Sequence, residues 1–272
     1  MSGLATHSNV RILFVGDSHF GVPLNEYLNV HANAPAYSIA YGGDSPRECY
    51  AKLRRALDLA PHVDTVIVSA DPHMFGRGRL ESSNRSFADR YFLMYGDRSG
   101  LPGGLWSALL QQVPLFSDDF LQYFRKSLGA MLGGTAAKAR AEGDPLDWSR
   151  LTDAERMKEA VETGREDHDG IGADGRPFMW YKRMLDLARE RHVSVIGMRF
   201  PVHVGYSSEA PPDQVAAIDR FLLGNGMARI VDLRGSLTDP RDFEDPDHVN
   251  EIGVVALTPI VEQALHRSLL KP

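Results

Sequence analysis

Short apolar runs rich in β-branched residues alternate along the chain with longer stretches of helical character. The runs fall at residues 10–15, 36–40, 63–69, 193–198 and 229–232. Strands that alternate with helices form parallel sheets whose two faces are covered by the helices. We therefore expect an α/β fold, a three-layer α/β/α sandwich built on a mostly parallel, flavodoxin-like sheet of five strands.

The helical stretches between and after these runs have apolar residues at helical spacing. They cover residues 21–29, 47–59, 178–191, 211–224 and 252–270. The alternation stops between residues 76 and 177, where glycine and proline interrupt helical and loop-like segments. We expect residues 76–177 to be a helical insertion, or cap, on an α/β domain formed by residues 1–75 and 178–272.

Composition narrows the class of protein. The chain has 272 residues, of which 43% are hydrophobic and 24% charged, as in soluble globular proteins. Its formal net charge of −6 offers no basic surface for nucleic acid. No apolar run approaches the roughly 20 residues of a membrane span, and the first nine residues lack an apolar signal core. We expect a soluble cytoplasmic protein, although a chain trimmed of an export signal would look the same.

The first predicted strand ends on Gly16-Asp17-Ser18, which puts a serine hydroxyl at the edge of the sheet where open α/β folds bind ligands. A hydroxyl is a weak nucleophile until a base lies beside it. Asp245 and His248 precede the last predicted helix and offer a base with an orienting carboxylate. The two ends of the chain together predict a serine-nucleophile site.

Each of these residues also has a plain structural explanation. Taken alone, Asp245 is a turn cap and His248 a surface histidine, and it is the strand-end serine that favours catalysis. Asp17 can accept backbone N–H groups at a helix start, where the same groups could hold an oxyanion. His19 neighbours the serine, but adjacent residues in a turn diverge, so we expect at most a substrate contact.

The blocks around Ser18 and His248 resemble those of the SGNH (GDSL-type) hydrolase superfamily. The resemblance implies that Ser18 is the nucleophile, His248 the general base and Asp245 its orienting carboxylate. It also implies an oxyanion hole that includes the N–H of Ser18 and of a glycine. The pair Gly42-Gly43 matches in position, with Gly43 preferred, although a glycine pair is also explained by a tight turn.

The third block departs from the superfamily pattern, in which Gly-x-Asn-Asp follows the third strand. This chain has Asp71-Pro72-His73 there. An ionised Asp71 could only accept hydrogen bonds. His73 could donate to the oxyanion in place of the missing asparagine, or it could be a loop histidine without a catalytic role.

Two further segments resemble one subgroup of the superfamily. Residues 71–75 are similar to a segment of the D-alanyl transfer protein of teichoic acid modification. Residues 243–253 are similar to the end that this protein shares with alginate-type O-acetyltransferases. These relatives handle acyl groups on cell-envelope polymers, which implies a carbohydrate-directed role for this chain.

Weaker candidates surround the predicted site. Arg47 could clamp an anionic substrate or be an exposed helix arginine, and His203 and Tyr206 could line the pocket or belong to a plain turn. Asp17, His19 and Asp71 complete the candidate substrate contacts. The run Asp167-His168-Asp169 does not suit a metal because consecutive residues do not converge as ligands, so we expect neither a metal nor another cofactor.

The sequence thus predicts a serine esterase or O-acyltransferase. It would act on an acyl ester of a carbohydrate or small hydroxylated substrate through an acyl-serine intermediate. Its partners would be an acyl donor and water or a hydroxyl acceptor. Two other interpretations stay open, a catalytically silent glycan-binding module and an accessory subunit of an acyltransferase system.

Overall fold

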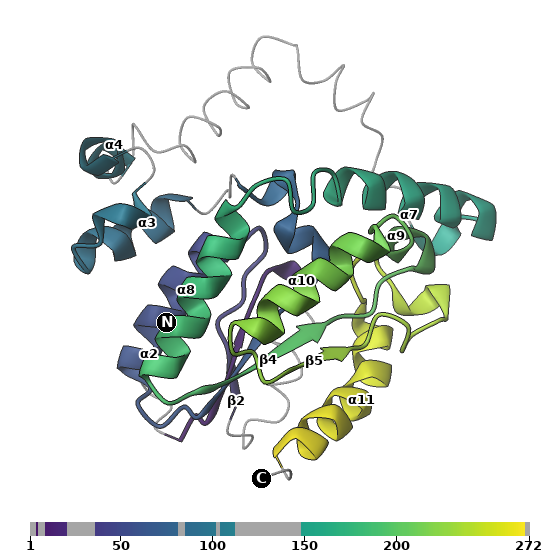
Figure 1. Ribbon diagram of the computed structural model, residues 1–272. Helices are drawn as coiled ribbons and strands as arrows, with labels where there is room; N and C mark the ends of the chain where they lie inside the picture. Colours follow the sequence, from purple (N-terminus) through teal and green to yellow (C-terminus); the bar gives the residue numbers. More distant parts are fainter. Residues whose placement is uncertain are drawn as a thin grey trace, which may run out of the picture.

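The sheet predicted from the sequence is present. The structure, a computed structural model, describes residues 4, 9–20, 36–80, 85–101, 104–111 and 148–269. At its centre five parallel strands lie in the order β2-β1-β3-β4-β5 (Figure 1). The strands are β1 (Ile12–Val15), β2 (Ala36–Ser38), β3 (Thr65–Ser69), β4 (Ser194–Arg199) and β5 (Arg229–Asp232). The α/β class, with a five-stranded parallel sheet, is therefore confirmed.

The helices follow the predicted spacing. They are α2 (Pro46–Leu59), α3 (Arg85–Met94), α4 (Gly104–Gln111), α7 (Asp153–Asp167), α8 (Arg176–Glu190), α9 (Val204–Ser207), α10 (Pro212–Gly224) and α11 (Glu251–Leu269). The helix predicted at residues 21–29 lies outside the described residues. The other predicted elements are found, with ends that differ slightly. The first strand, for example, is shorter than predicted because its ladder pairing starts only at Ile12, opposite Ala36 and Thr65.

The sheet is covered on both faces because alternate residues of each strand point to opposite sides. Leu13 and Val66 belong to one hydrophobic cluster, which α2, α8 and α10 complete. Ile12 and Ile67 belong to a second cluster, to which α11 contributes Val254, Leu257 and Val261. Strands β1 and β3 are buried along their whole length, which is typical of central strands in a parallel sheet.

Helix α2 begins one residue before its predicted start because the local sequence caps it. The side chain of Ser45 accepts a hydrogen bond from the backbone N–H of Arg47, and Glu48 binds back to the Ser45 N–H. Pro46 occupies the first helical turn, where its missing N–H costs nothing. The capped start fixes the direction in which the chain leaves the preceding glycine pair.

The described parts of the 76–177 segment pack on the α/β domain rather than on a core of their own. Phe92 of α3 and Ala108 of α4 join the cluster that contains Trp180 of α8. Helix α7 packs closely against α9, where a Cβ added at Gly164 would lie 2.6 Å from the carbonyl oxygen of Tyr206. The division into domain and insertion stays a prediction. In the part of the chain that the structure describes, no helix has the length and apolar character to cross a bilayer.

Candidate active site

Ser18 lies on the turn that follows β1, at the carboxyl edge of the sheet. The turn is tight because Gly16 has no side chain, and a Cβ there would meet Phe20 Cδ2 at 2.9 Å and Ser69 Cβ at 3.1 Å. Asp17, His19 and Phe20 are buried, whereas Ser18 is half-buried. Of these four consecutive residues, the serine is therefore the one whose side chain solvent can reach.

The predicted glycine pair lies beside Ser18. The N–H of Tyr41 donates to the carbonyl of Gly16, and the N–H of Asp44 donates to the carbonyl of Tyr41, which closes a turn over the two glycines. Gly43 has φ of 76°, a conformation that favours glycine. A Cβ added at Gly42 would lie 3.9 Å from Cβ of Ser18. The structure thus brings the turn that carries the predicted nucleophile, which we call the nucleophile turn, next to the glycine turn.

Asp245 and His248 form a hydrogen-bonded pair on the loop before α11. We define this loop as residues 243–249 and, after the role predicted for it, call it the catalytic loop. Phe243 and Val249 close it with an antiparallel bridge. Both carboxylate oxygens of Asp245 lie 2.9 Å from Nδ1 of His248, and Oδ1 also accepts the backbone N–H of His248. A carboxylate at Nδ1 places the hydrogen there and leaves Nε2 as the nitrogen that can take a proton.

The structure places the Ser18 turn and the catalytic loop next to each other. The ring of His19 lies edge-on to the ring of His248, with centroids 5.4 Å apart. The Ser18 hydroxyl makes no hydrogen bond to His248 among the described residues. Catalytic hydrogen bonds are often long in unliganded enzymes and tighten only when substrate binds.

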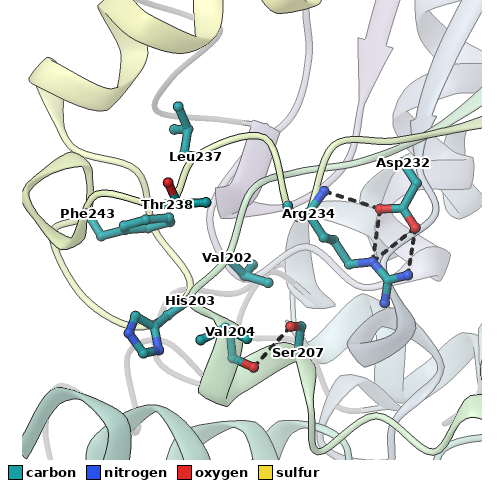
Figure 2. Close-up of a pocket in the computed structure, with 10 residues that line it drawn as sticks. Val202, His203, Val204, Ser207, Asp232, Arg234, Leu237, Thr238 and Phe243 are labelled. Carbon is teal, nitrogen blue, oxygen red and sulfur yellow. Dashed lines mark hydrogen bonds and ion pairs between the residues drawn. The ribbon is translucent and has the colours of Figure 1, made fainter. Parts of the chain in front are cut away.

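A cavity of about 690 Å³ adjoins the catalytic loop (Figure 2). It is lined by Val202, His203, Val204, Ser207, Asp232, Arg234, Gly235, Leu237, Thr238 and Phe243. The backbone N–H of His203 donates a 2.8 Å hydrogen bond to the carbonyl of Pro246, so the cavity shares a wall with that loop. Its volume falls within the roughly 300–1,000 Å³ of small-molecule sites.

His203 enters this cavity wall as a neutral hydrogen-bond donor. The N–H of Gly205 donates to Nδ1 of His203, which puts the ring hydrogen on Nε2. Burial, together with the guanidinium of Arg156, lowers the pKa of His203. Among the described residues its Nε2 has no partner. Of the side chains predicted to contact substrate, His203 is the one that lines this cavity.

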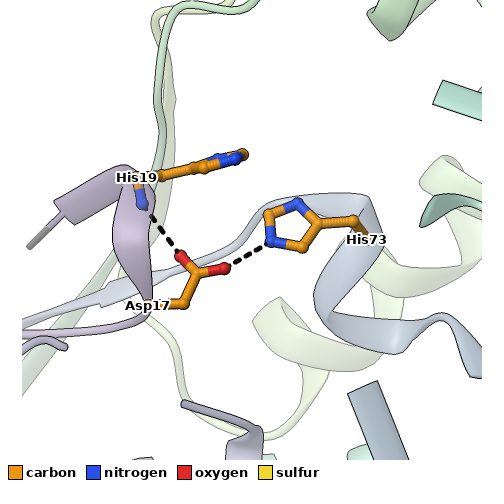
Figure 3. A group of neighbouring side chains, drawn as sticks. All are labelled: Asp17, His19 and His73. Carbon is orange, nitrogen blue, oxygen red and sulfur yellow. Dashed lines mark hydrogen bonds and ion pairs between the residues drawn. The ribbon is translucent and has the colours of Figure 1, made fainter. Parts of the chain in front are cut away.

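His73 faces Asp17 on the inner side of the nucleophile turn (Figure 3). Its Nε2 donates a 2.6 Å hydrogen bond to Oδ2 of Asp17, whose Oδ1 accepts the backbone N–H of His19. Both side chains of this pair are buried. His73 therefore has a structural partner that the sequence did not indicate, and its oxyanion role stays a prediction.

Several residues predicted to contact substrate are buried inside the fold. Asp17 and Asp71 are buried, and Tyr206 is buried and donates to the carboxylate of Asp167. Arg47 is neither a substrate clamp nor an exposed helix arginine, since it is buried and binds Asp89 and the carbonyl of Gly100. We leave these residues out of the proposed substrate contacts because their polar groups already have partners within the protein.

His19 is the strongest departure from the sequence-based expectation. Instead of reaching substrate it is buried, and its Nε2 donates a 3.0 Å hydrogen bond to Oδ2 of Asp247. The sequence analysis did not single out Asp247. The two residues are separated by 228 positions, so no local spacing could have connected them.

The pKa shifts follow from these contacts. Burial alone would lower the pKa of His248, yet the hydrogen bonds to Asp245 and the nearby carboxylate of Asp247 raise it to about 9. Burial alone would raise the pKa of Asp247, but the hydrogen bond from His19 and the nearby ring of His248 bring it below its usual range. At neutral pH the resting site therefore holds a protonated His248 between two carboxylates.

Among the residues that the structure describes, two groups of side chains have the donor types and spacing to hold a cation. The first is Asp17, His19 and His73, and the second is His19, Asp247 and His248, with ligand atoms within 4.8 Å of one another in each group. In the structure these atoms are joined by hydrogen bonds from His73 to Asp17 and from His19 to Asp247. A metal would have to displace those hydrogens, so the arrangement fits a proton-linked network better.

Comparison with protein-family models gives no match, and neither does comparison with curated proteins. Two solved structures have a similar backbone arrangement. One is a candidate acylhydrolase from Bacteroides fragilis, with a TM-score of 0.48 and 12% identity over 95% of this chain and 88% of that one. The other is a GDSL-like lipase from Bacteroides thetaiotaomicron, with a TM-score of 0.48 and 9% identity over 97% and 90%. Neither likeness is close enough to assign a residue or a reaction to this chain.

Proposed function

We propose that this protein is a serine acyl hydrolase of the SGNH type that cleaves carboxylic esters. Ser18 is the nucleophile, His248 the general base and Asp245 the carboxylate that orients it. The observation that carries the proposal is the Asp245–His248 pair, with both carboxylate oxygens 2.9 Å from Nδ1, on a loop that contacts the neighbour of Ser18. An imidazole held in this way presents Nε2 as the base.

The reaction begins when the Ser18 Oγ attacks the ester carbonyl carbon and Nε2 of the neutral His248 takes the hydroxyl proton. The new C–O bond turns the carbonyl oxygen into an oxyanion, which the N–H groups of Ser18 and Gly43 stabilise. Collapse of this intermediate breaks the ester bond. The leaving alkoxide takes the proton from His248 and departs as an alcohol, and the acyl group stays on Ser18.

The second half repeats the chemistry with water. His248, again neutral, takes a proton from water as its oxygen attacks the acyl-serine carbonyl. The tetrahedral intermediate expels Ser18 Oγ, which recovers its proton from His248, and the acid is released. An acceptor hydroxyl could replace water, and the product would then be a new ester. Which acceptor dominates depends on how well the site excludes water.

The cavity next to the catalytic loop supports a hydroxylated substrate, carbohydrates included. The hydroxyls of Thr238 and Ser207 and the Nε2 hydrogen of His203 are polar groups on its wall, and Phe243 adds an aromatic surface. Polar donors beside an apolar ring suit a ligand with hydroxyls on one side and C–H groups on the other. We propose that this cavity takes the alcohol part of the ester or the acceptor.

A second candidate function is a catalytically silent binding module that keeps the cavity and has lost hydrolysis. Two observations favour it, namely the absence of a Ser18–His248 hydrogen bond among the described residues and the raised pKa of His248. The same surface would then bind a glycan or a partner of an acyltransferase system. The assay below separates this candidate from the hydrolase.

Hydrolysis of p-nitrophenyl acetate by the parent and by Ser18→Ala tests the proposal. Ser194→Ala is the matched control, because Ser194 is exposed at the opposite end of β4. We expect Ser18→Ala to fall to background while Ser194→Ala keeps the parent rate. A fluorophosphonate should label the parent on Ser18, located by mass spectrometry. Equal rates in the parent and Ser18→Ala, with no label on Ser18, would instead support the binding module.

A further inference from the structure

His19 is buried beside the proposed nucleophile, and both of its ring nitrogens face carboxylates. Its Nε2 donates a 3.0 Å hydrogen bond to Oδ2 of Asp247, and its Nδ1 lies 3.5 Å from Oδ2 of Asp71. Carboxylate oxygens only accept, so a ring held between two of them is most stable with a hydrogen on each nitrogen. The arrangement holds His19 as a buried cation.

Three loops meet at this cation. His19 belongs to the turn after β1, Asp71 follows β3, and Asp247 belongs to the catalytic loop. The position of Asp71 is secured in turn by the hydroxyl of Ser69, which donates to its Oδ2 at 3.1 Å. The acidic residue that replaces the expected asparagine of the third block is thus a counterion for His19.

The carboxylate that His19 binds also faces the proposed base. Asp247 Oδ1 lies 3.4 Å from Nδ1 of His248, whereas both oxygens of Asp245 lie 2.9 Å from it. Nδ1 carries a single hydrogen, so the two carboxylates compete for it. His19 binds the other oxygen of Asp247, Oδ2, and thereby anchors this carboxylate with Oδ1 farther from Nδ1 of His248 than either oxygen of Asp245.

We propose that His19 is a positioning residue that keeps Asp247 away from the Nδ1 hydrogen of His248, so that Asp245 alone orients the base. This inference rests on the proposed roles of Ser18 and His248. His19, the residue after the proposed nucleophile, thus acts through Asp247 and not through contact with substrate.

Charge and burial support this role. Asp247 is 7% exposed, and a buried carboxylate is strongly destabilised unless a cation pairs with it. Without a charge on His19, His248 is the other cation that contacts Asp247. The Asp247–His248 ion pair would then shorten, and Nδ1 of His248 would turn from Asp245 toward Asp247.

The pKa values of both histidines agree with this arrangement. The groups that face His19 are Asp17, Asp71, His73, Asp247 and His248. Burial alone would lower the pKa of His19, but Asp17, the hydrogen bond to Asp247 and the nearby carboxylate of Asp71 raise it well above its usual value. The positive charge of His19 in turn lowers the pKa of His248, against the effect of Asp245 and Asp247.

The test uses His19→Gln, Asp247→Asn and the double variant, with kcat/KM for p-nitrophenyl acetate measured across pH. Glutamine keeps a donor for Asp247 but has no charge. We expect His19→Gln to move the acid limb of the kcat/KM–pH profile to higher pH by about one unit, which lowers kcat/KM on that limb about tenfold. Asp247→Asn should move the limb downward, and the double variant should lose the upward shift because the competing carboxylate is gone.

His168→Gln is the matched control. His168 is another buried histidine, but its ring packs on Tyr206, and burial lowers its pKa to about 4, so it is already neutral. We expect this variant to keep the acid limb of the parent. A limb unchanged in His19→Gln would overturn the proposal, and so would an upward shift that persists in the double variant.

Imidazole NMR spectra recorded during a pH titration separate this inference from the proposed function. His248 should titrate at higher pH in His19→Gln and at lower pH in Asp247→Asn, whether or not the protein hydrolyses esters. If Ser18→Ala retained the parent rate, the hydrolase proposal would fail while the titration still decided the role of His19. If His19→Gln did not fold, an unshifted His248 in Asp247→Asn would overturn the inference by itself.

Discussion

Asp245 faces His248 with both carboxylate oxygens equally distant from Nδ1, at 2.9 Å, and also accepts the backbone N–H of the same histidine. One side chain therefore fixes the backbone of the loop, the orientation of the ring and the nitrogen that carries the hydrogen. Because Nδ1 is saturated by Asp245, the proton-accepting chemistry of His248 is confined to Nε2. The following predictions depend on this pair and on the groups around it.

Ester hydrolysis should increase with pH up to about 9. The pKa of His248 is raised to about 9, so the neutral base is a small fraction at neutral pH. Below that value kcat/KM should rise about tenfold for each pH unit. Initial rates between about pH 6 and about pH 10, corrected for spontaneous hydrolysis, would show the limb. A plateau already reached near neutral pH would contradict a protonated His248.

Asp245→Asn should abolish most activity and leave the loop folded. The asparagine oxygen can still accept from the backbone N–H and from Nδ1 of His248, but an NH₂ group, which can only donate, replaces the second oxygen that faces Nδ1 and the negative charge is gone, so the tautomer and ring orientation are no longer fixed. We expect kcat to fall by about 10²- to 10⁴-fold, the upper figure being the known loss in a serine protease triad. Asp242→Asn, on the half-buried turn that precedes the same loop, is the control. Similar kcat values for the two variants would exclude the proposed orienting role.

Gly43→Ala should reduce kcat more than Gly96→Ala does. Both glycines have positive φ, 76° for Gly43 and 64° for Gly96, so alanine strains each by about 1 kcal/mol. Gly96 has open space around it and lies away from Ser18, which makes it a control for strain alone. Urea denaturation should show similar losses of stability for the two variants. If kcat fell equally in both, the Gly43 N–H would have no part in the oxyanion hole.

Asp17→Asn should destabilise the fold because it removes the charge from a buried pair. The carboxylate of Asp17 accepts from Nε2 of His73 at 2.6 Å, and neither side chain is exposed. Removing one partner of such a pair costs about 3–5 kcal/mol of the free energy of unfolding. Urea denaturation would measure it, with Asp239→Asn in the surface pair with Arg241 as control. A urea midpoint of Asp17→Asn no lower than that of Asp239→Asn would show that the buried Asp17–His73 pair contributes nothing to stability.

The fold could be predicted because its signal is local. The run 63–69 contains three consecutive apolar residues, Val66, Ile67 and Val68, and central parallel strands need apolar residues on both faces. The observed strand ends differ from the predicted ones because ladder pairing requires a neighbouring strand. Val10 is buried, yet β1 begins at Ile12, where its partners on β2 and β3 begin.

The candidate site could be predicted only in part. Ser18, Asp245 and His248 lie in motifs that span a few residues each, so they could be predicted as site residues before the fold was known, and their roles stay a prediction. Arg47 was misjudged because its sequence neighbours indicate a surface helix, whereas α3 and Gly100 close over it. Its burial depends on packing between segments, which no short window of sequence contains.

The sequence by itself determined the order of strands and helices and the chemical types present at the sheet edge, because periodicity and motif spacing act over short distances along the chain. Only the tertiary structure decided which buried charges share a partner. The contacts of His19 with Asp71 and Asp247, and of His73 with Asp17, join groups far apart in sequence. The physical reason is that a charge taken out of water must find an opposite charge in space, wherever along the chain that partner lies.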